Sequence, residues 1–184
     1  MATPPDFSVG GVLTAGQMNQ VGLWKIAQAT LTGTAVNITS CFSSSFDSYR
    51  IIVSDLANGV TAAYLQFQLL TGTTPANAAN TYKWQRLNAN NAVVAGVSGS
   101  DTQGAIAAFG TYGANAVSID IYDPAKSLYT KATSVGMYDQ NSGAPVTEQF
   151  AVAHLVATAY DGIRLMPSGG NFYSGKVTVY GYRL

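Results

Sequence analysis

Three residues of this 184-residue chain could do chemistry and are each the only one of their kind: His154, Cys41 and Glu148. A serine or cysteine hydrolase pairs its nucleophile with a histidine, which here would have to be His154. The Gly-x-Ser-x-Gly spacing of a nucleophile elbow is absent, since residues 96–100 read Gly-Val-Ser-Gly-Ser. His154 lies in an apolar run, which favours a hydrogen-bonded strand histidine without a catalytic role.

The surroundings of Cys41 do not activate a thiol. Thr39, Ser40 and Phe42 supply neither a basic side chain nor a helix terminus, the features that lower the pKa of a cysteine. We therefore expect Cys41 to be a small buried side chain. One cysteine and one histidine also exclude a zinc site of the usual kind. The segment 139–143 lacks the glycine spacing and the closing glutamate of an EF-hand calcium loop, so the sequence predicts no metal and no cofactor.

A glycosidase needs two carboxyl groups held across a cleft, and Glu148 would have to be one of them. Several of the candidate partners resemble turn or strand-end residues, such as Asp123 before Pro124 and Asp161 before Gly162. The spacing selects no partner from the candidates, which are Asp47, Asp55, Asp101, Asp120, Asp123, Asp139 and Asp161. We therefore predict that the chain is not an enzyme and has no catalytic residues.

The charge content of the chain is low. Charged residues make up 10% of the sequence, and nine basic residues balance nine acidic ones. This composition excludes the clustered Lys and Arg of a polyanion-binding surface, so we predict no nucleic-acid partner. Tyr82 and Trp84 could stack on a sugar, although aromatic residues more often pack in cores and interfaces. A carbohydrate-binding module is therefore an alternative function, with Tyr82 and Trp84 as candidate receptor or glycan contacts.

The elements that position these residues are predicted to be strands. From residue 23 onward, apolar and polar residues alternate with the period of a half-buried strand, as at Val117, Ile119 and Ile121. Segments with strand signals are 24–31, 49–54, 64–69, 81–86, 117–122, 132–138, 148–158, 162–165 and 176–180. Turn signals separate them, and residues 88–104 are predicted to be a long loop. We predict an all-β fold, an antiparallel β-sandwich of jelly-roll-like type with about nine or ten strands.

The first 22 residues differ from this strand-rich body. Pro4-Pro5 gives an extended start, and the segment 14–17 has the spacing of a helix capping box. A short helix is predicted over 14–19, and it needs packing against another surface to persist. The chain is therefore divided into an anchoring segment, residues 1–22, and a β-sandwich domain, residues 23–184.

Neither a targeting signal nor a membrane segment is expected. Residues 1–7 have neither the positive charge nor the apolar stretch of a secretory signal. The most apolar stretch, residues 150–160, is about half the length of a membrane-spanning helix. We expect a protein that is made in a cytoplasm and does not insert into membranes. Its neutral surface, rich in hydroxyl and amide groups, would suit a virus particle released by lysis.

Three segments resemble structural proteins of bacteriophage virions. Residues 7–19, FSVGGVLTAGQMN, are similar to the phe-x-x-gly-x-val-leu-thr-ala-x-x-met-asn segment at the start of many tail-fibre and virion-appendage proteins. Residues 163–183 resemble the last hairpin of phage structural β-sandwiches, which often close on gly-x-ile-x-val-tyr-gly. Residues 42–53 are similar to an early strand of that group. The segments lie in matching order along the chain.

The resemblance implies a virion structural protein, above all a tail-fibre, baseplate or spike subunit. It implies other virion proteins as partners, a homotrimer, and contact with a host surface glycan or receptor. The apolar side chains that would dock the anchoring segment on a neighbouring virion subunit are Phe7, Val12, Leu13, Met18 and Val21. They could instead pack on the sandwich of their own chain. A capsid decoration (cement) protein stays as an alternative, because the resemblance does not separate tail proteins from head proteins.

Overall fold

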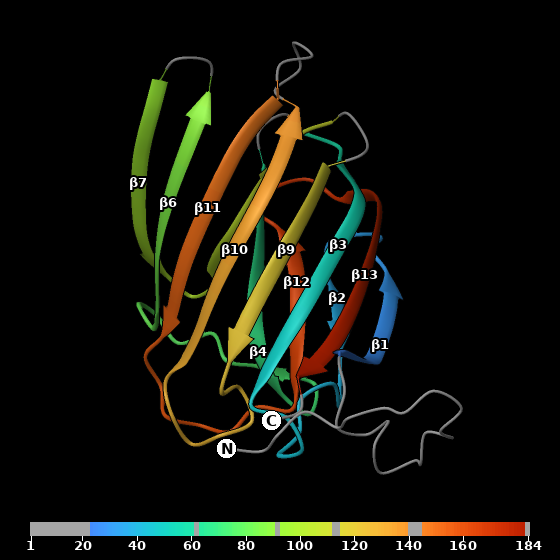
Figure 1. The fold of residues 1–184 in the computed structure, drawn as a ribbon, viewed down its shortest axis with the longest axis vertical. Helices are drawn as coiled ribbons and strands as arrows, with labels where there is room; N and C mark the ends of the chain where they lie inside the picture. Colours follow the sequence, from blue (N-terminus) through green and yellow to red (C-terminus); the bar gives the residue numbers. More distant parts are fainter. Residues whose placement is uncertain (1–22, 61–62, 91–92, 112–114, 140–144, 183–184) are drawn as a thin grey trace, which may run out of the picture.

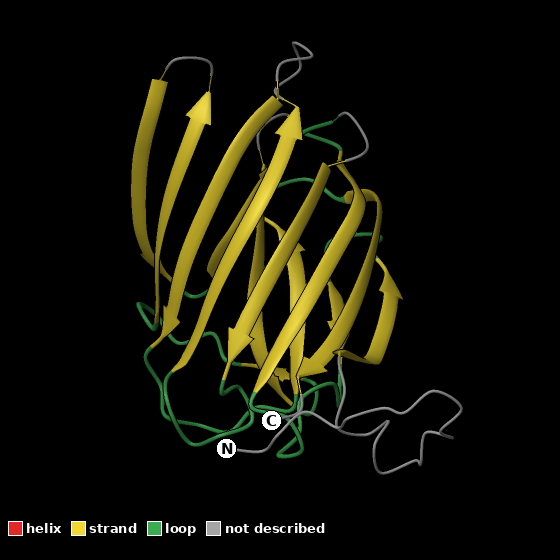
Figure 2. Ribbon diagram, in the orientation of Figure 1, coloured by secondary structure: helices red, strands yellow, loops and turns green. Residues whose placement is uncertain are grey.

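The computed structural model describes residues 23–60, 63–90, 93–111, 115–139 and 145–182. These residues form 13 strands in two antiparallel sheets that face each other, and none of them is helical (Figure 2). The predicted all-β sandwich is confirmed, with more strands than the eight of a simple jelly roll. The helix predicted over 14–19 and the rest of the anchoring segment lie outside the described residues. Within the described part of the chain there is no helix long and apolar enough to cross a membrane.

The larger sheet, here called sheet A, has eight strands. Their order across the sheet is β1 (Leu23–Thr30), β13 (Phe172–Tyr182), β3 (Ser48–Asn58), β9 (Asn115–Tyr122), β10 (Thr130–Asp139), β11 (Pro145–His154), β6 (Tyr82–Asn90) and β7 (Val93–Asp101). The smaller sheet, sheet B, contains β2 (Val36–Ile38), β12 (Gly162–Pro167), β4 (Ala63–Thr71), β5 (Thr74–Pro75) and β8 (Gly104–Phe109), with β8 and β5 both paired to β4. Figure 1 shows sheet A in front and sheet B behind it.

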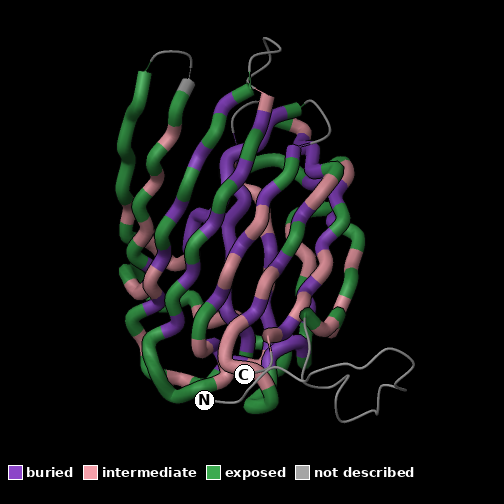
Figure 3. Tube along the Cα trace, in the orientation of Figure 1, coloured by how far each residue is buried: buried purple, intermediate pink, exposed green. Residues whose placement is uncertain are grey.

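Alternation along the strands of sheet A separates an inner face from an outer face. On β9, Val117, Ile119 and Ile121 are buried against sheet B, while Ala116 and Tyr122 are exposed. Buried and exposed residues alternate along β10 and β11 in the same way (Figure 3). This is the period-2 pattern expected when one face of a sheet packs on the core and the other meets water. The apolar core therefore lies between the sheets, and none of the described segments covers the outer face of sheet A.

Strand β8 was not predicted from the sequence. All six of its residues are buried, because it pairs with β4 in sheet B and packs against β10 and β11 of sheet A. A strand buried on both faces shows no alternation of polarity, so the pattern that revealed β9 is absent. Small residues at Gly104, Ala105, Ala107 and Ala108 allow the close approach of sheet A.

Two sequence-based interpretations are corrected by the structure. Residues 88–104, predicted to be a loop, contribute to strands β6 and β7, which pair without interruption from Tyr82–Asp101 to Asn90–Val93. All of β7 from Val93 to Ser98 is exposed, so polarity does not alternate there either. Residues 163–183 are also not a hairpin, since β12 pairs in sheet B and β13 pairs in sheet A. The connection between them crosses from one sheet to the other.

Candidate functional site

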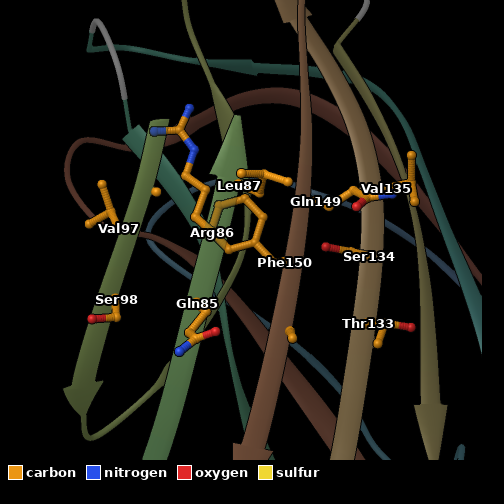
Figure 4. A pocket seen from close by; sticks show the side chains of 12 residues that line it. Gln85, Arg86, Leu87, Val97, Ser98, Thr133, Ser134, Val135, Gln149 and Phe150 are labelled. Carbon is orange, nitrogen blue, oxygen red and sulfur yellow. The ribbon is translucent and has the colours of Figure 1, made fainter. Parts of the chain in front are cut away.

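A shallow hollow of about 770 Å³ lies on the outer face of sheet A, across β10, β11, β6 and β7. We call it the outer groove. The pairing of the strands places its outward side chains in two neighbouring rows. One row contains Thr133, Ala151, Gln85 and Ser98, and the next contains Val135, Gln149, Leu87 and Gly96. Figure 4 labels the larger side chains around the hollow, among them Gln85, Thr133 and Gln149. Ala151 and Gly96, which are smaller than their neighbours, also line it.

A second hollow continues the outer groove along β11 by one more row. In that row Lys131, Ala153, Lys83 and Ser100 lie side by side, and Lys83 Nζ donates a hydrogen bond of 2.5 Å to Ser100 Oγ. The complete groove therefore offers amide groups, hydroxyl groups and two ammonium groups around an alanine floor. None of the residues that line the two hollows is acidic. Such a surface can donate and accept hydrogen bonds with neutral polar or weakly anionic groups.

Behind the outer groove, the alternate residues of β6 and β11 form a buried ion pair. Arg86 Nε donates to Glu148 Oε2 at 3.0 Å, and the side chain of Glu148 is only 1% exposed. Arg86 Nη2 donates to the Tyr138 hydroxyl at 3.1 Å, and the guanidinium lies 5.6 Å from the ring centre of Tyr64 and 5.9 Å from that of Phe150. These rings enclose the cation, as in other cation–π contacts.

Glu148 and Ser134 complete the hydrogen bonding of strand β8. The backbone N–H of Ala108 donates to Glu148 Oε1, and Ser134 Oγ donates to the backbone carbonyl of Ile106. One edge of β8 pairs with β4, and these two side chains from sheet A satisfy groups on β8 that β4 does not reach. Buried backbone groups need such partners. Glu148, the residue a glycosidase would have required, is therefore engaged in holding the two sheets together.

Burial raises the pKa of Glu148 from its ordinary value of 4.5 to about 7, against the opposing effects of the Ala108 N–H and of Arg86. Carboxyl groups with a raised pKa often mark general acids. A general acid must also reach a substrate. Here one carboxyl oxygen is held by Arg86 and the other by Ala108, and the group is closed off from the outer groove by the sheet itself. The geometry therefore indicates that Glu148 has a structural role, although its pKa is raised.

His154 and Cys41 are both buried. His154 Nε2 lies 2.7 Å from the Tyr160 hydroxyl, its ring packs 4.2 Å from that of Tyr82, and burial lowers its pKa. The Cys41 thiol donates to the Ile38 carbonyl at 3.3 Å, and burial raises its pKa to about 12. Such a thiol has almost no thiolate at neutral pH. Among the described residues, no group of three or more His, Cys, Asp or Glu side chains could hold a metal ion.

Of the candidate glycan contacts, Tyr82 lines neither hollow, and Trp84 is among the residues of the second hollow although its ring packs inward on Tyr64 and Phe150. Tyr82 is fully buried, so its proposed sugar contact is corrected: its hydroxyl accepts from Leu69 N–H at 2.9 Å and donates to the Ala76 carbonyl at 3.0 Å. Trp84 is half-buried on the inner face, where its indole covers Gly99 so closely that an added Cβ would lie 2.4 Å away. Both rings serve packing, the more common use of aromatic residues.

The groove residues were missed by sequence reasoning, and the five candidate anchor residues lie outside the described part of the chain. Gln85, Thr133 and Gln149 stand at the outward positions of predicted strands, which was the available signal. The alternation of polarity does not show which strands are neighbours in the sheet.

Comparison of the chain with family models, with curated proteins and with solved structures finds no match. The function must therefore be argued from the chain itself.

Proposed function

We propose that this chain is a structural protein of a bacteriophage virion, a subunit of a tail fibre, baseplate or spike. In this proposal residues 1–22 attach it to neighbouring virion proteins, and the outer face of sheet A meets a partner or the host surface. The support from the sequence is the resemblance of three segments to phage virion proteins. Residues 7–19 lie outside the described part of the chain, and residues 163–183 do not form the hairpin that the resemblance implies, so residues 42–53 and 163–183 support the proposal only as strands of a sandwich. In the fold these segments contribute to β3, β12 and β13, which build the body of the sandwich.

The observation that carries the proposal is the outer face of sheet A, which no described segment covers. Exposed apolar side chains lie in two adjacent rows across it: Ile52, Val135 and Leu87 in one, and Met137 and Val94 in the next. Val135 is 54% exposed and Met137 is 52% exposed. Ile52, Val135 and Met137 line one hollow, whereas Gln149 separates Val135 from Leu87. Exposed apolar side chains grouped on one face are typical of a site of interaction with another macromolecule. A virion subunit acts by contacting other macromolecules over a broad surface, and the outer face of sheet A offers such a surface.

Localisation in the particle tests the proposal. Antibodies raised against the purified chain would be applied, with gold labels, to phage particles produced from the genome that encodes it. Label on the tail supports the appendage function. Regular label over the capsid shell would favour the decoration-protein alternative, and particles without label would overturn a virion role.

A carbohydrate-binding module is the second candidate, and the outer groove is the observation that favours it. Gln85, Gln149, Thr133 and Ser98 present amide and hydroxyl groups along a shallow open channel, and these groups match the hydroxyls of a sugar. Glycan-array binding by the full chain, weakened by Gln149→Ala, would support this function. An array without binding would remove it and leave the structural proposal untouched.

A further inference from the structure

Strand β7 ends sheet A with an edge that has no partner strand among the described residues. Its nine residues pair with β6 on one side only, and the register between the two strands has no bulge. Val93 is 64% exposed, Val94 is 67% exposed and Val97 is 47% exposed. Since neighbouring residues of a strand face opposite ways, apolar side chains are exposed on both faces of β7. In Figure 1 the upper part of the β6–β7 hairpin stands clear of sheet B.

The opposite edge of the same sheet is protected, whereas β7 is not. Strand β1 contains Lys25, and its register with β13 shifts between Lys25 and Ala27. A lysine and a bulge are two of the devices that keep edge strands from pairing with other chains. Strand β7, with the sequence VVAGVSGSD, has no lysine, arginine or proline, and its only charged residue is the final Asp101. A nine-residue edge without a bulge, with exposed valines and no charge before its last residue, is expected to pair with another strand.

We propose that β7 pairs with β7 of a second copy of this chain, antiparallel and around a twofold axis at Val97. The sequence of β7 fits itself in this register. Val93 of one copy then lies opposite Asp101 of the other, Val94 lies opposite Ser100, and Ala95 lies opposite Gly99. Each of these pairs therefore sets a larger residue against a smaller or polar one.

The charges also favour a second copy as the partner. The two Asp101 carboxylates lie at opposite ends of the paired strands, about eight residues or roughly 27 Å apart, which is beyond the screening length at physiological salt. No like charges within β7 face each other across the pairing. The two eight-stranded sheets then join into one continuous sheet, and the two outer grooves lie on the same side of it, flanking the new contact.

This inference does not depend on the virion function. It also differs from the homotrimer that the sequence resemblance implies. When two copies pair their β7 edges around a twofold axis, neither edge is left free to bind a third copy. A threefold axis would have to bring together different surfaces of the chain. The oligomeric state in solution therefore distinguishes the two arrangements.

The test is the mass of the full chain in solution, measured by light scattering or sedimentation. We expect twice the 19.2 kDa of one chain. The variant Val97→Lys places two ammonium groups opposite each other at the axis and should weaken the dimer roughly tenfold or more. The matched control is Val135→Lys, a substitution of a valine of similar exposure at the centre of the outer face, which should leave the dimer intact. Circular dichroism checks that both variants remain β-rich.

A cysteine variant gives a second readout that does not rely on weakening the dimer. Val97→Cys should form a disulfide between copies on oxidation, while Val135→Cys should not, and the native Cys41 is buried. A monomeric or trimeric wild-type chain would overturn the proposal. So would a dimer that survives Val97→Lys, or one that Val135→Lys dissociates, since the contact would then use the outer face.

Discussion

The carboxyl group of Glu148 accepts a backbone hydrogen bond from β8 that a neighbouring strand would otherwise accept. One of its oxygens accepts from the Ala108 N–H of β8, and the other accepts from Arg86 of β6. The residue type and the raised pKa are those of a general acid, yet the side chain is closed off from solvent and from the outer groove. At this position residue chemistry alone would have suggested catalysis, and the contacts assign a structural role.

Replacing Glu148 by alanine is expected to destabilise the fold. The variant would leave the largely buried Arg86 guanidinium without its carboxylate and the buried Ala108 N–H without an acceptor. We expect the free energy of unfolding, measured by urea titration, to fall by about 2–4 kcal/mol. The matched control is Gln149→Ala on the exposed outer face, expected to change it by less than about 0.5 kcal/mol. Equal effects of the two substitutions would contradict the structural role of Glu148.

The raised pKa of Glu148 predicts a pH dependence of stability. Its pKa is about 7 in the folded protein and 4.5 as its ordinary value, so between these pH values the folded state holds a proton that the unfolded chain has released. The free energy of unfolding therefore decreases as pH rises through this window. We expect the wild type to lose on the order of 1–3 kcal/mol relative to Glu148→Gln between pH 4.5 and 7.

Urea titrations of the two proteins at several pH values measure this difference. Burial lowers the pKa of His154, which makes the fold less stable as pH falls, but this contribution is the same in both proteins and cancels. If the wild type instead gained stability relative to Glu148→Gln with rising pH, Arg86 would be lowering the pKa of Glu148, and the predicted sign would be wrong.

At the scale of elements, the close packing of β8 against sheet A requires a glycine at position 104. A Cβ added to Gly104 would lie 2.7 Å from the Phe67 ring and 2.7 Å from a methyl group of Val152, and both neighbours are buried. Gly104→Ala should therefore overpack the core and lower the free energy of unfolding by about 1–3 kcal/mol. Thermal or urea unfolding measures the loss.

The control for this prediction is Gly96→Ala on β7. The nearest heavy atom to a Cβ there is the Arg86 carbonyl oxygen at 3.8 Å, an ordinary contact. Gly96→Ala should leave the free energy of unfolding within about 0.5 kcal/mol of the wild type. If Gly104→Ala is equally harmless, the approach of β8 to sheet A is looser than the structure indicates.

For the whole molecule, we predict that residues 1–22 attach the protein while the sandwich folds without them. The buried apolar residues described in the structure, from Leu31 to Val179, are supplied by the two sheets and the turns beside them. Deleting residues 1–22 should leave a soluble protein with a β-type circular-dichroism spectrum that no longer incorporates into phage particles. Unfolding of the truncated protein would show that the segment is part of the core. Normal incorporation would move the attachment site to the sandwich and favour the decoration-protein alternative.

The sequence by itself determined the fold class and most strands of this protein. β9, β10 and β13 each bury one face and expose the other, so their polarity alternates and can be recognised without neighbours. The same reasoning failed for β8, which is buried on both faces, and for β7, which is exposed on both faces. Periodicity reports a difference between two faces, and neither strand has one.

Only the tertiary structure decided which residues lie together. Gln85, Ala151 and Thr133 form one row of the outer groove although they are far apart in sequence, and Arg86 finds Glu148 across 62 positions. Alternation fixes which face a side chain takes, but it carries no information on strand order or register. Strand order and register are determined by how the side chains of both sheets pack together in the core. This is why the sequence left Glu148 without a partner and placed Tyr82 at a sugar-binding surface, whereas the fold buries both in the interior.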